Sequence, residues 1–155
     1  MADIFTKRRR SEIMARIRSK DTGPEIALRR KLFGAGLRFR KHYRTAGVNV
    51  DIAFPKRKVA VFVHGCFWHG HRKCGGWKLP KSNSGFWRRK IKRNRDRDRR
   101  VLAALRRSGW TPVVVWECQV SERTMSCALR IAAAWALGNP VLEAIDNDPQ
   151  NRLEY

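Results

Sequence analysis

A short apolar run that leads directly into a cluster of histidines and cysteines constrains this chain more than any other feature. Residues 59–74 read VAVFVHGCFWHGHRKC. The first five residues are too few for a buried helix and are rich in β-branched side chains, so they predict a central strand that is covered on both faces. Such a strand would hold His64 and the residues after it in a fixed place.

The charge of the chain indicates a polyanionic partner. The 155 residues include 35 Lys and Arg against 13 Asp and Glu, which gives a net charge of +22. Like charge at this density destabilises a folded chain unless it faces a polyanion, and nucleic acid is the obvious one. A membrane-spanning helix needs roughly 20 apolar residues, and the sequence has neither such a run nor an apolar signal core. We therefore expect a soluble cytoplasmic protein whose four cysteines stay reduced.

Hydrophobic spacing predicts an α/β fold in which helices flank a mixed β-sheet. The expected strands cover residues 37–43, 48–54, 59–63 and 113–116. The expected helices cover residues 11–17, 22–34, 84–109 and 123–137, with Thr22-Gly-Pro-Glu25 as a capping box, Ser84 as a cap, and Ile26, Leu28, Leu32 and Phe33 on an inner face. We expect residues 1–10 to form a basic arm, residues 11–138 a single domain, and residues 139–155 a tail.

Four residues have the side chains and spacing of zinc ligands. Cys66, His71 and Cys74 lie within one tight loop, and Cys118 follows the second buried strand. Four protein ligands leave no open position for substrate, so this zinc would be structural. The alternative is a set of buried thiols with surface histidines. We expect Cys127, in the last helix, only to pack.

Two histidines and one acid remain for chemistry. His64 and His69 are not needed for the zinc tetrahedron, and Asp51 is the one acid in an apolar strand. Adjacent strands that carry an acid and a second polar group hold Mg²⁺ in many nucleases, since this hard cation prefers oxygen ligands. The alternating pattern is equally compatible with an Asp51 that points to solvent. We interpret His42, on a basic strand, as an ordinary surface histidine.

Aromatic residues interrupt the zinc loop where polar residues would be usual. Phe67 and Trp68 stand between a zinc ligand and His69, a poor place for core residues and a good one for side chains that enter a base stack. Phe86 and Trp87 open a strongly cationic helix. The other tryptophans are interpreted as core residues, namely Trp77, Trp110, Trp116 and Trp135.

Together these motifs resemble the very short patch repair endonucleases. The run V-H-G-C-F-W-H-G-H-x-x-C, Asp51 before it, and F-W-x-x-K-I-x-x-N-x-x-R-D and V-x-x-W-E-C after it occur in order between about Ser11 and Cys118. That family is bacterial, has a restriction-endonuclease-like core, and nicks one strand of DNA beside a T:G mismatch left by deamination of 5-methylcytosine. The resemblance implies a Mg²⁺-dependent DNA-repair endonuclease with a structural Zn²⁺, acting as a monomer at the nucleoid.

The resemblance also implies roles for individual residues. Asp51 and the backbone carbonyl of Val63 would bind Mg²⁺, and His64 and His69 would flank the phosphate. Asp98 would orient His69, and Glu25 would support the site. The zinc ligands would be those named above, and the intercalating residues would be Phe67, Trp68 and Trp87. Phosphate contacts are expected from Lys7, Arg8, Arg9, Arg10, Arg88, Arg89 and Lys92.

Two other functions are compatible with the sequence. One is a restriction- or homing-type nuclease that cuts fully paired DNA. The other is a non-catalytic, zinc-containing nucleic-acid-binding module, in which charge and aromatic residues provide binding alone.

Overall fold

A computed structural model describes residues 20–72, 74 and 78–120, together with positions 6, 8, 9 and 12 near the N-terminus. The helix expected at residues 123–137, all of the helix expected at residues 11–17 except position 12, the tail, and Lys7, Arg10, Trp77, Cys127 and Trp135 therefore lie outside the described residues. The boundaries expected for the arm, domain and tail stay predictions. Among the described residues, no helix is long and apolar enough to cross a membrane.

A four-stranded mixed sheet forms the centre of the fold, as predicted. Its strands are β1 (Arg40–Thr45), β2 (Val48–Phe54), β3 (Val59–His64) and β4 (Thr111–Trp116), and they lie in that order across the sheet. β1 pairs with β2 and β2 with β3 in antiparallel directions, whereas β3 and β4 are parallel. Because parallel strands end at the same edge, His64 lies beside Trp116.

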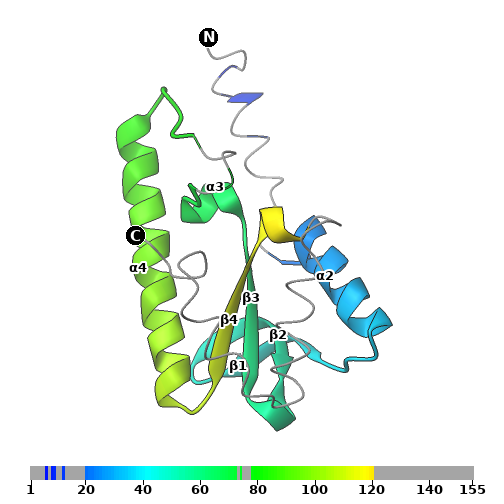
Figure 1. The fold of residues 1–155 in the computed structure, drawn as a ribbon. Helices are drawn as coiled ribbons and strands as arrows, with labels where there is room; N and C mark the ends of the chain where they lie inside the picture. The colour runs from blue at the N-terminus through cyan, green and yellow to red at the C-terminus, as the bar shows by residue number, and fades with distance from the viewer. Residues whose placement is uncertain are drawn as a thin grey trace.

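Two helices cover opposite faces of this sheet (Figure 1). Leu28 and Leu32 of α2 (Gly23–Gly34) pack with Val59 and Val61 in one core cluster. Leu102 and Leu105 of α4 (Ser84–Arg107) pack with Ala60 and Phe62 in the other. Successive β3 residues thus enter opposite layers, which confirms that this strand is central and covered on both faces.

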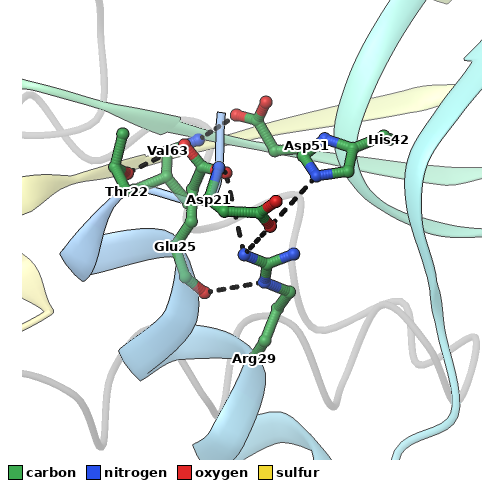
Figure 2. Close-up of polar contacts among 7 residues, drawn as sticks. All are labelled: Asp21, Thr22, Glu25, Arg29, His42, Asp51 and Val63. Carbon is green, nitrogen blue, oxygen red and sulfur yellow. Dashed lines mark hydrogen bonds and ion pairs between the residues drawn. The ribbon is translucent and has the colours of Figure 1, made fainter. Parts of the chain in front are cut away.

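The strict alternation expected for β2 is wrong at Asp51. Val50 packs in the layer under α4, but Ile52 and Phe54 pack in the layer under α2. Two residues that are two positions apart share a face in a regular strand, so the strand is distorted between them. The pairs Tyr43–Val50 and Lys41–Ile52 place Asp51 across from His42, whose φ of 48° is left-handed. This distortion brings the Asp51 carboxylate next to the N-terminal end of α2 (Figure 2).

Several helix boundaries differ from the expected ones. Asn83 occupies the N-cap position of α4, so Ser84 is its first helical residue rather than its cap, and the helix ends at Arg107 instead of residue 109. Thr22 precedes α2 without capping it by its side chain, because its hydroxyl donates to the Glu25 carboxylate instead. Phe33, expected on the inner face, is 59% exposed.

The segment after β3 also differs, because part of it is helical. Residues expected to form only a zinc loop begin with a single helical turn, α3 (Cys66–His69). The 3-10 turn η2 (Glu117–Gln119) follows β4. The start of α2, α3 and η2 lie at the same end of the sheet (Figure 1).

Candidate active site and metal centre

One cleft at the end of β3 gathers every residue that was expected to take part in catalysis. It lies between the start of α2, α3 and the middle of α4 and also includes Glu117, which follows β4. The expected residues that line it are Glu25, Asp51, Val63, His64, His69 and Asp98. These residues come from five different elements, so only the fold brings them together.

His69 and Asp98 form a tightly bonded pair in the wall of this cleft. Nδ1 of His69 lies 2.5 Å from Oδ2 of Asp98, and both side chains are largely buried. Burial disfavours the Asp98 carboxylate, but the His69 hydrogen bond and nearby positive charge outweigh this and hold the pKa of Asp98 below its ordinary value. An ionised Asp98 fixes the ring of His69 and turns Nε2 away from α4, which leaves that nitrogen for proton transfer.

His64 stacks face to face on His69. The ring centroids are 3.9 Å apart and the planes differ by 8°. Burial, followed by the proximity of His69, lowers the pKa of His64 to about 3, so this imidazole is neutral near pH 7. Among the described residues, Nδ1 of His64 is the buried side-chain polar atom without a hydrogen-bond partner. A buried polar atom without a partner is costly to the fold, so its retention needs an explanation such as a role in function.

Asp51 is held at the point where β2 and β3 separate. The pairing of β2 with β3 runs from Phe54 opposite Val59 to Ile52 opposite Val61 and stops there. Beyond it, the Val63 amide donates to the side chain of Asp51, at Oδ2, over 2.8 Å. Burial raises the pKa of Asp51, the Val63 N–H opposes this, and the charge of Glu25 adds to it. Asp51 therefore does not point freely to solvent, which resolves the alternative left open by the strand pattern.

The oxygen atoms around Asp51 fit a hard divalent cation. Asp51, Glu25 and Val63 all line the cleft, and carboxylate and carbonyl oxygens are the ligands that Mg²⁺ prefers. The group His64, His69 and Asp98 also has the spacing of a metal site. Nδ1 of His69 and Oδ2 of Asp98 already bond each other at 2.5 Å, so neither atom is available to a metal ion. The oxygen atoms of Asp51, Glu25 and Val63 are therefore the better candidate ligands for Mg²⁺.

The four expected zinc ligands converge on one point. The ligand atoms of Cys66, His71, Cys74 and Cys118 all lie within 4.8 Å of one another. Nδ1 of His71 is 3.5 Å from the Sγ atoms of both Cys66 and Cys118. A tetrahedral zinc with bonds of about 2.3 Å to sulfur and about 2.0 Å to nitrogen gives S···N edges of about 3.5 Å, so the set fits this ion.

The thiols of this cluster stay protonated in the absence of a metal ion. Burial raises the pKa of the Cys66 thiol to about 12 and raises that of Cys118 as well. Such thiols become thiolates only when a positive charge compensates them, and a metal ion provides it. No disulfide joins the three described cysteines.

Trp116 connects the metal-ligand cluster to the cleft. Its ring stacks on His71 with centroids 4.3 Å apart and planes 7° from parallel, and it meets His64 edge-on at 5.4 Å. Trp116 is buried as expected, but sequence reasoning treated it only as core and missed this position between the two sites.

The three expected intercalating residues form one aromatic group beside the cleft. Phe67, Trp68 and Trp87 are half-buried, and their ring centroids lie 5.1 to 5.9 Å apart. Phe86 packs against Trp87 and is 48% exposed. The group is thus attached to the same short helix that carries His69.

Two residues of α4 that sequence reasoning missed hold this short helix. Asn94 donates to the carbonyl of Trp68 at 2.8 Å. Arg95 donates to the carbonyls of His69 at 3.0 Å and Gly70 at 2.6 Å. These bonds satisfy the last carbonyls of α3, which a single turn cannot pair internally. Asn94 is a specified position of the F-W-x-x-K-I-x-x-N-x-x-R-D motif, so the sequence did mark it as a candidate. Arg95 is an unspecified position of the same motif, so nothing in the sequence marked it.

The expected phosphate-binding residues that the structure describes are exposed. Arg8 and Arg9 contact Glu12 in the N-terminal segment. Arg88, Arg89 and Lys92 are exposed on α4, where Lys92 pairs with Asp96 at 3.0 Å. A further hollow along α4 is lined mainly by cations, namely Lys90, Arg93, Arg97, Arg99 and Arg100.

The interpretation of His42 as an ordinary surface histidine is wrong. Its Nε2 lies 3.1 Å from Oδ1 of Asp21, and its side chain is 25% exposed. Arg29 donates to the same Asp21 oxygen at 2.6 Å, beside Glu25 and Asp51 (Figure 2). The left-handed backbone at His42 left no signal in the sequence, because a histidine in a basic strand is compatible with a regular conformation.

A mixed sheet between two helices, with acids and a His–Asp pair at the strand ends, defines a restriction-endonuclease-like nuclease fold. The catalytic domain of the homing endonuclease I-Bth0305I shares this fold, with a TM-score of 0.53, 17% identity, and coverage of 77% of this chain and 99% of that domain.

Sequence comparison gives the family within this class. The sequence model of the family described as DNA mismatch endonuclease Vsr matches residues 2–75. The type II nicking enzyme V.XorIIP of Xanthomonas oryzae pv. oryzae is 47% identical over 122 residues, which cover 79% of this chain and 89% of that enzyme. The DNA mismatch endonuclease Vsr of Escherichia coli is 38% identical over 123 residues, which cover 79% of this chain and 78% of that enzyme. The chain belongs to the Vsr family of DNA mismatch endonucleases.

Proposed function

We propose that this protein, a mismatch-specific nicking endonuclease, cuts one strand of duplex DNA beside a T:G mismatch and requires Mg²⁺ to do so. The observation that carries the proposal is the cleft in which the bonded His69–Asp98 pair and the acid Asp51 line the same space. The relatives described as nicking enzymes and as a mismatch endonuclease support the same reaction. We expect the active species to be a monomer, because one nick needs only one such cleft.

The residues of the cleft divide the hydrolysis between them. His69 is held through Nδ1 by Asp98, so its Nε2 can take a proton from the attacking water or return one to the leaving oxygen. A new P–O bond forms to the water oxygen, the bond from phosphorus to a deoxyribose oxygen breaks, and that oxygen leaves with a proton. The neutral His64 ring supports His69 by stacking and can donate a hydrogen bond to a phosphate oxygen.

Asp51 and the Val63 carbonyl would hold Mg²⁺, with Glu25 beside them. Bound Mg²⁺ supplies charge stabilisation at the phosphorus and lowers the pKa of bound water. The residues of the protein fix its place, because Asp51 is held by the Val63 amide at 2.8 Å and Glu25 by Thr22 at 2.8 Å.

The aromatic group would recognise the damaged step. Phe67, Trp68 and Trp87 are packed against one another and would enter the stack as a wedge. Unstacking costs a few kcal/mol and least at a mismatched step, so insertion itself favours mismatched DNA. Zn²⁺ on Cys66, His71, Cys74 and Cys118 would fix the loop that carries two of these rings.

A nicking assay on labelled duplexes tests the proposal. Zinc-loaded wild type should nick a T:G duplex in Mg²⁺, should cut matched duplex and other mismatches far less, and should not nick when Mg²⁺ is left out. Asp51→Ala and His69→Ala should reduce the rate by at least about a hundredfold. Asp96→Asn, at a partly exposed position of the same helix as Asp98, is the matched control and should keep the wild-type rate.

Other outcomes of this assay reject the proposal. Equal cleavage of matched duplex would indicate a restriction- or homing-type nuclease instead. A wild type that nicks none of the duplexes, and an Asp51→Ala variant that binds DNA as wild type does, would indicate a non-catalytic binding module.

A further inference from the structure

A charged network lies directly behind the acids of the cleft (Figure 2). Oδ1 of Asp21 accepts from Nη2 of Arg29 at 2.6 Å and lies 3.1 Å from Nε2 of His42. The Asp21 amide donates to Oε2 of Glu25 at 3.1 Å, and Nε of Arg29 donates to the Glu25 carbonyl at 3.2 Å. Asp21 thus joins the start of α2, which carries Glu25, to β1, which carries His42.

This network is not itself a metal site. Asp21, Glu25 and His42 offer ligand atoms within 4.8 Å of one another, which by spacing alone would suit a cation. The guanidinium of Arg29, whose side chain is 11% exposed, already bonds the same Asp21 oxygen. A second positive ion on that oxygen would meet a fixed positive charge, so the contacts favour an ion-pair network.

The two residues that make the link both have unfavourable backbone conformations. The φ angles of Asp21 and His42 are 52° and 48°, a left-handed region that is uncommon for residues other than glycine, although Asp and His enter it more readily than most. Such conformations persist only where the surroundings hold them, and they concentrate at functional sites. Here each strained residue presents its side chain to the other across two elements.

The position of the link explains what it would do. His42 lies across from Asp51 in the β1–β2 pairing, and Asp21 lies one residue before the N-cap of α2. Asp51 and Glu25 carry like charge, and the charge of Glu25 acts on Asp51. The two carboxylates therefore repel each other, and a bond between their supporting elements opposes that repulsion.

We propose that Asp21 and His42 are positioning residues whose contact holds Glu25 beside Asp51 at the spacing that a divalent cation requires. The inference rests on the proposed function, since it concerns the Mg²⁺ site assigned to Asp51. Neither Asp21 nor His42 lines the cleft, so they act through Glu25 and Asp51 and do not touch the phosphate.

Binding of Mn²⁺ to the full-length, zinc-loaded protein without DNA tests this role. Electron paramagnetic resonance counts the free ion, and Asp51→Ala defines the binding that belongs to the cleft. His42→Ala should weaken that binding by roughly tenfold or more, as is usual when a partner behind a metal ligand is lost. The Mg²⁺ concentration for half-maximal nicking of a T:G duplex should rise by a similar factor.

Two further variants separate positioning from charge and from general damage. His42→Gln keeps a hydrogen-bond donor for Asp21 and should recover most of the affinity. Lys41→Ala removes a positive charge from the adjacent exposed position of β1 and should bind Mn²⁺ as wild type does. DNA affinity of the zinc-loaded variants, measured by fluorescence anisotropy with no Mg²⁺ or Mn²⁺ added, should be the same for all of them, which a misfolded protein would not show.

The inference is overturned if His42→Ala binds Mn²⁺ like wild type, if His42→Gln is no better than His42→Ala, or if Lys41→Ala is equally impaired. A wild type that neither binds Mn²⁺ at Asp51 nor nicks DNA rejects the proposed function itself. The two failures are therefore distinguishable.

Discussion

At the scale of single residues, the hydrogen bond between His69 and Asp98 should contribute both to the nicking reaction and to the free energy of unfolding. The Asp98 side chain is 8% exposed, and its pKa is lower than the ordinary 3.8 because the His69 bond and nearby positive charge outweigh burial. A carboxyl group whose pKa is lower in the folded state stabilises the fold at any pH above its unfolded value. That contribution is lost as the pH falls through the lowered pKa.

Asp98→Asn should therefore reduce both stability and activity. We expect the free energy of unfolding near pH 7 to fall by about 1–3 kcal/mol, the range for a hydrogen bond to a charged group. Nicking should fall by at least about a hundredfold because His69 loses its orienting partner. Urea denaturation at about pH 7 and about pH 5 should give the same difference, since both values lie above the ordinary carboxyl pKa.

Asp96→Asn is the matched control, because Asp96 lies two positions earlier on α4 and its ion pairs with Lys92 and Arg99 are exposed. Its effect should stay within about 0.5 kcal/mol. A difference between Asp98→Asn and wild type that has already vanished at about pH 5 would contradict the assigned direction of the Asp98 pKa.

Single residues also show where sequence reasoning stopped. The types and spacing of His64, His69 and the four expected zinc ligands were enough to predict that they gather after β3, and the structure brings them together there. Asp51 remained ambiguous, because an alternating strand does not show which residue faces a partner. The role of His42 depends on its backbone angle and on Asp21, 21 positions earlier, and neither is encoded in local spacing.

At the scale of elements, the bonds between α3 and α4 link the position of the aromatic group to the position of His69. A four-residue helix is too short to show a hydrophobic period, so the segment could be expected only as a loop. Asn94, Arg95 and Asp98 of α4 bond Trp68, His69 and Gly70. If DNA displaces one of these aromatic residues, the backbone of His69 should therefore shift with it.

Gly70→Ala should loosen this attachment. Gly70 has a φ of 66°, and a Cβ atom there would lie 2.6 Å from Nη2 of Arg95 and 3.0 Å from Cγ2 of Ile91. The left-handed conformation alone costs about 1–2 kcal/mol for a residue with a side chain. We expect a loss of about 2–3 kcal/mol in the free energy of unfolding and a lower nicking rate, measured by urea denaturation and by single-turnover kinetics.

Gly85→Ala gives the comparison within the same protein. Gly85 lies in the first turn of α4, and its new Cβ would meet only Nη1 of Arg89 at an ordinary 3.5 Å. This substitution should be neutral or should stabilise by up to about 1 kcal/mol, as is usual for glycine in a helix. Equal effects of the two substitutions would show that α3 is not held as described.

For the whole molecule, the arrangement of a sheet between two helical layers, and the place of the cleft at the end of β3, follow from the apolar runs of the sequence. The apolar β3 run predicts a strand under two layers, and the parallel pairing with β4 then brings residues 64 and 116 together. The distortion of β2, which places Val50 and Ile52 in different layers, could not be predicted, because the sequence alternates as in a regular strand. That choice is made by tertiary packing and not by local preference.

Removal of the expected structural zinc should affect the whole molecule. The cluster joins the loop after β3, through Cys66, His71 and Cys74, to the end of β4, through Cys118. A strong chelator should lower the melting temperature and abolish nicking, and Zn²⁺ should restore both. Metal analysis should find about one zinc per chain, and Cys118→Ser should reduce that content. A protein that keeps its stability and activity without bound metal would reject a structural role for the cluster.

The net charge of +22 belongs to the whole molecule, but only part of it should contact DNA. Arg88 and Arg89 lie in the exposed start of α4, near the aromatic group, whereas Arg106 and Arg107 lie at its other end, beside the beginning of β4 (Figure 1). Eighteen residues of helix separate the two pairs by roughly 27 Å. A substitution of either pair removes the same charge, so a difference between them reports position and not total charge.

DNA affinity measured against salt concentration distinguishes these pairs. Replacing Arg88 and Arg89 by Ala should reduce the slope of log affinity against log salt by about two, since each phosphate contact contributes close to one. The loss should be the same for T:G and matched duplexes, because phosphate contacts carry no sequence information. Replacing Arg106 and Arg107 should leave the slope unchanged. If both pairs reduce it equally, the positive charge attracts DNA through its overall field and α4 has no directed phosphate contact at its start.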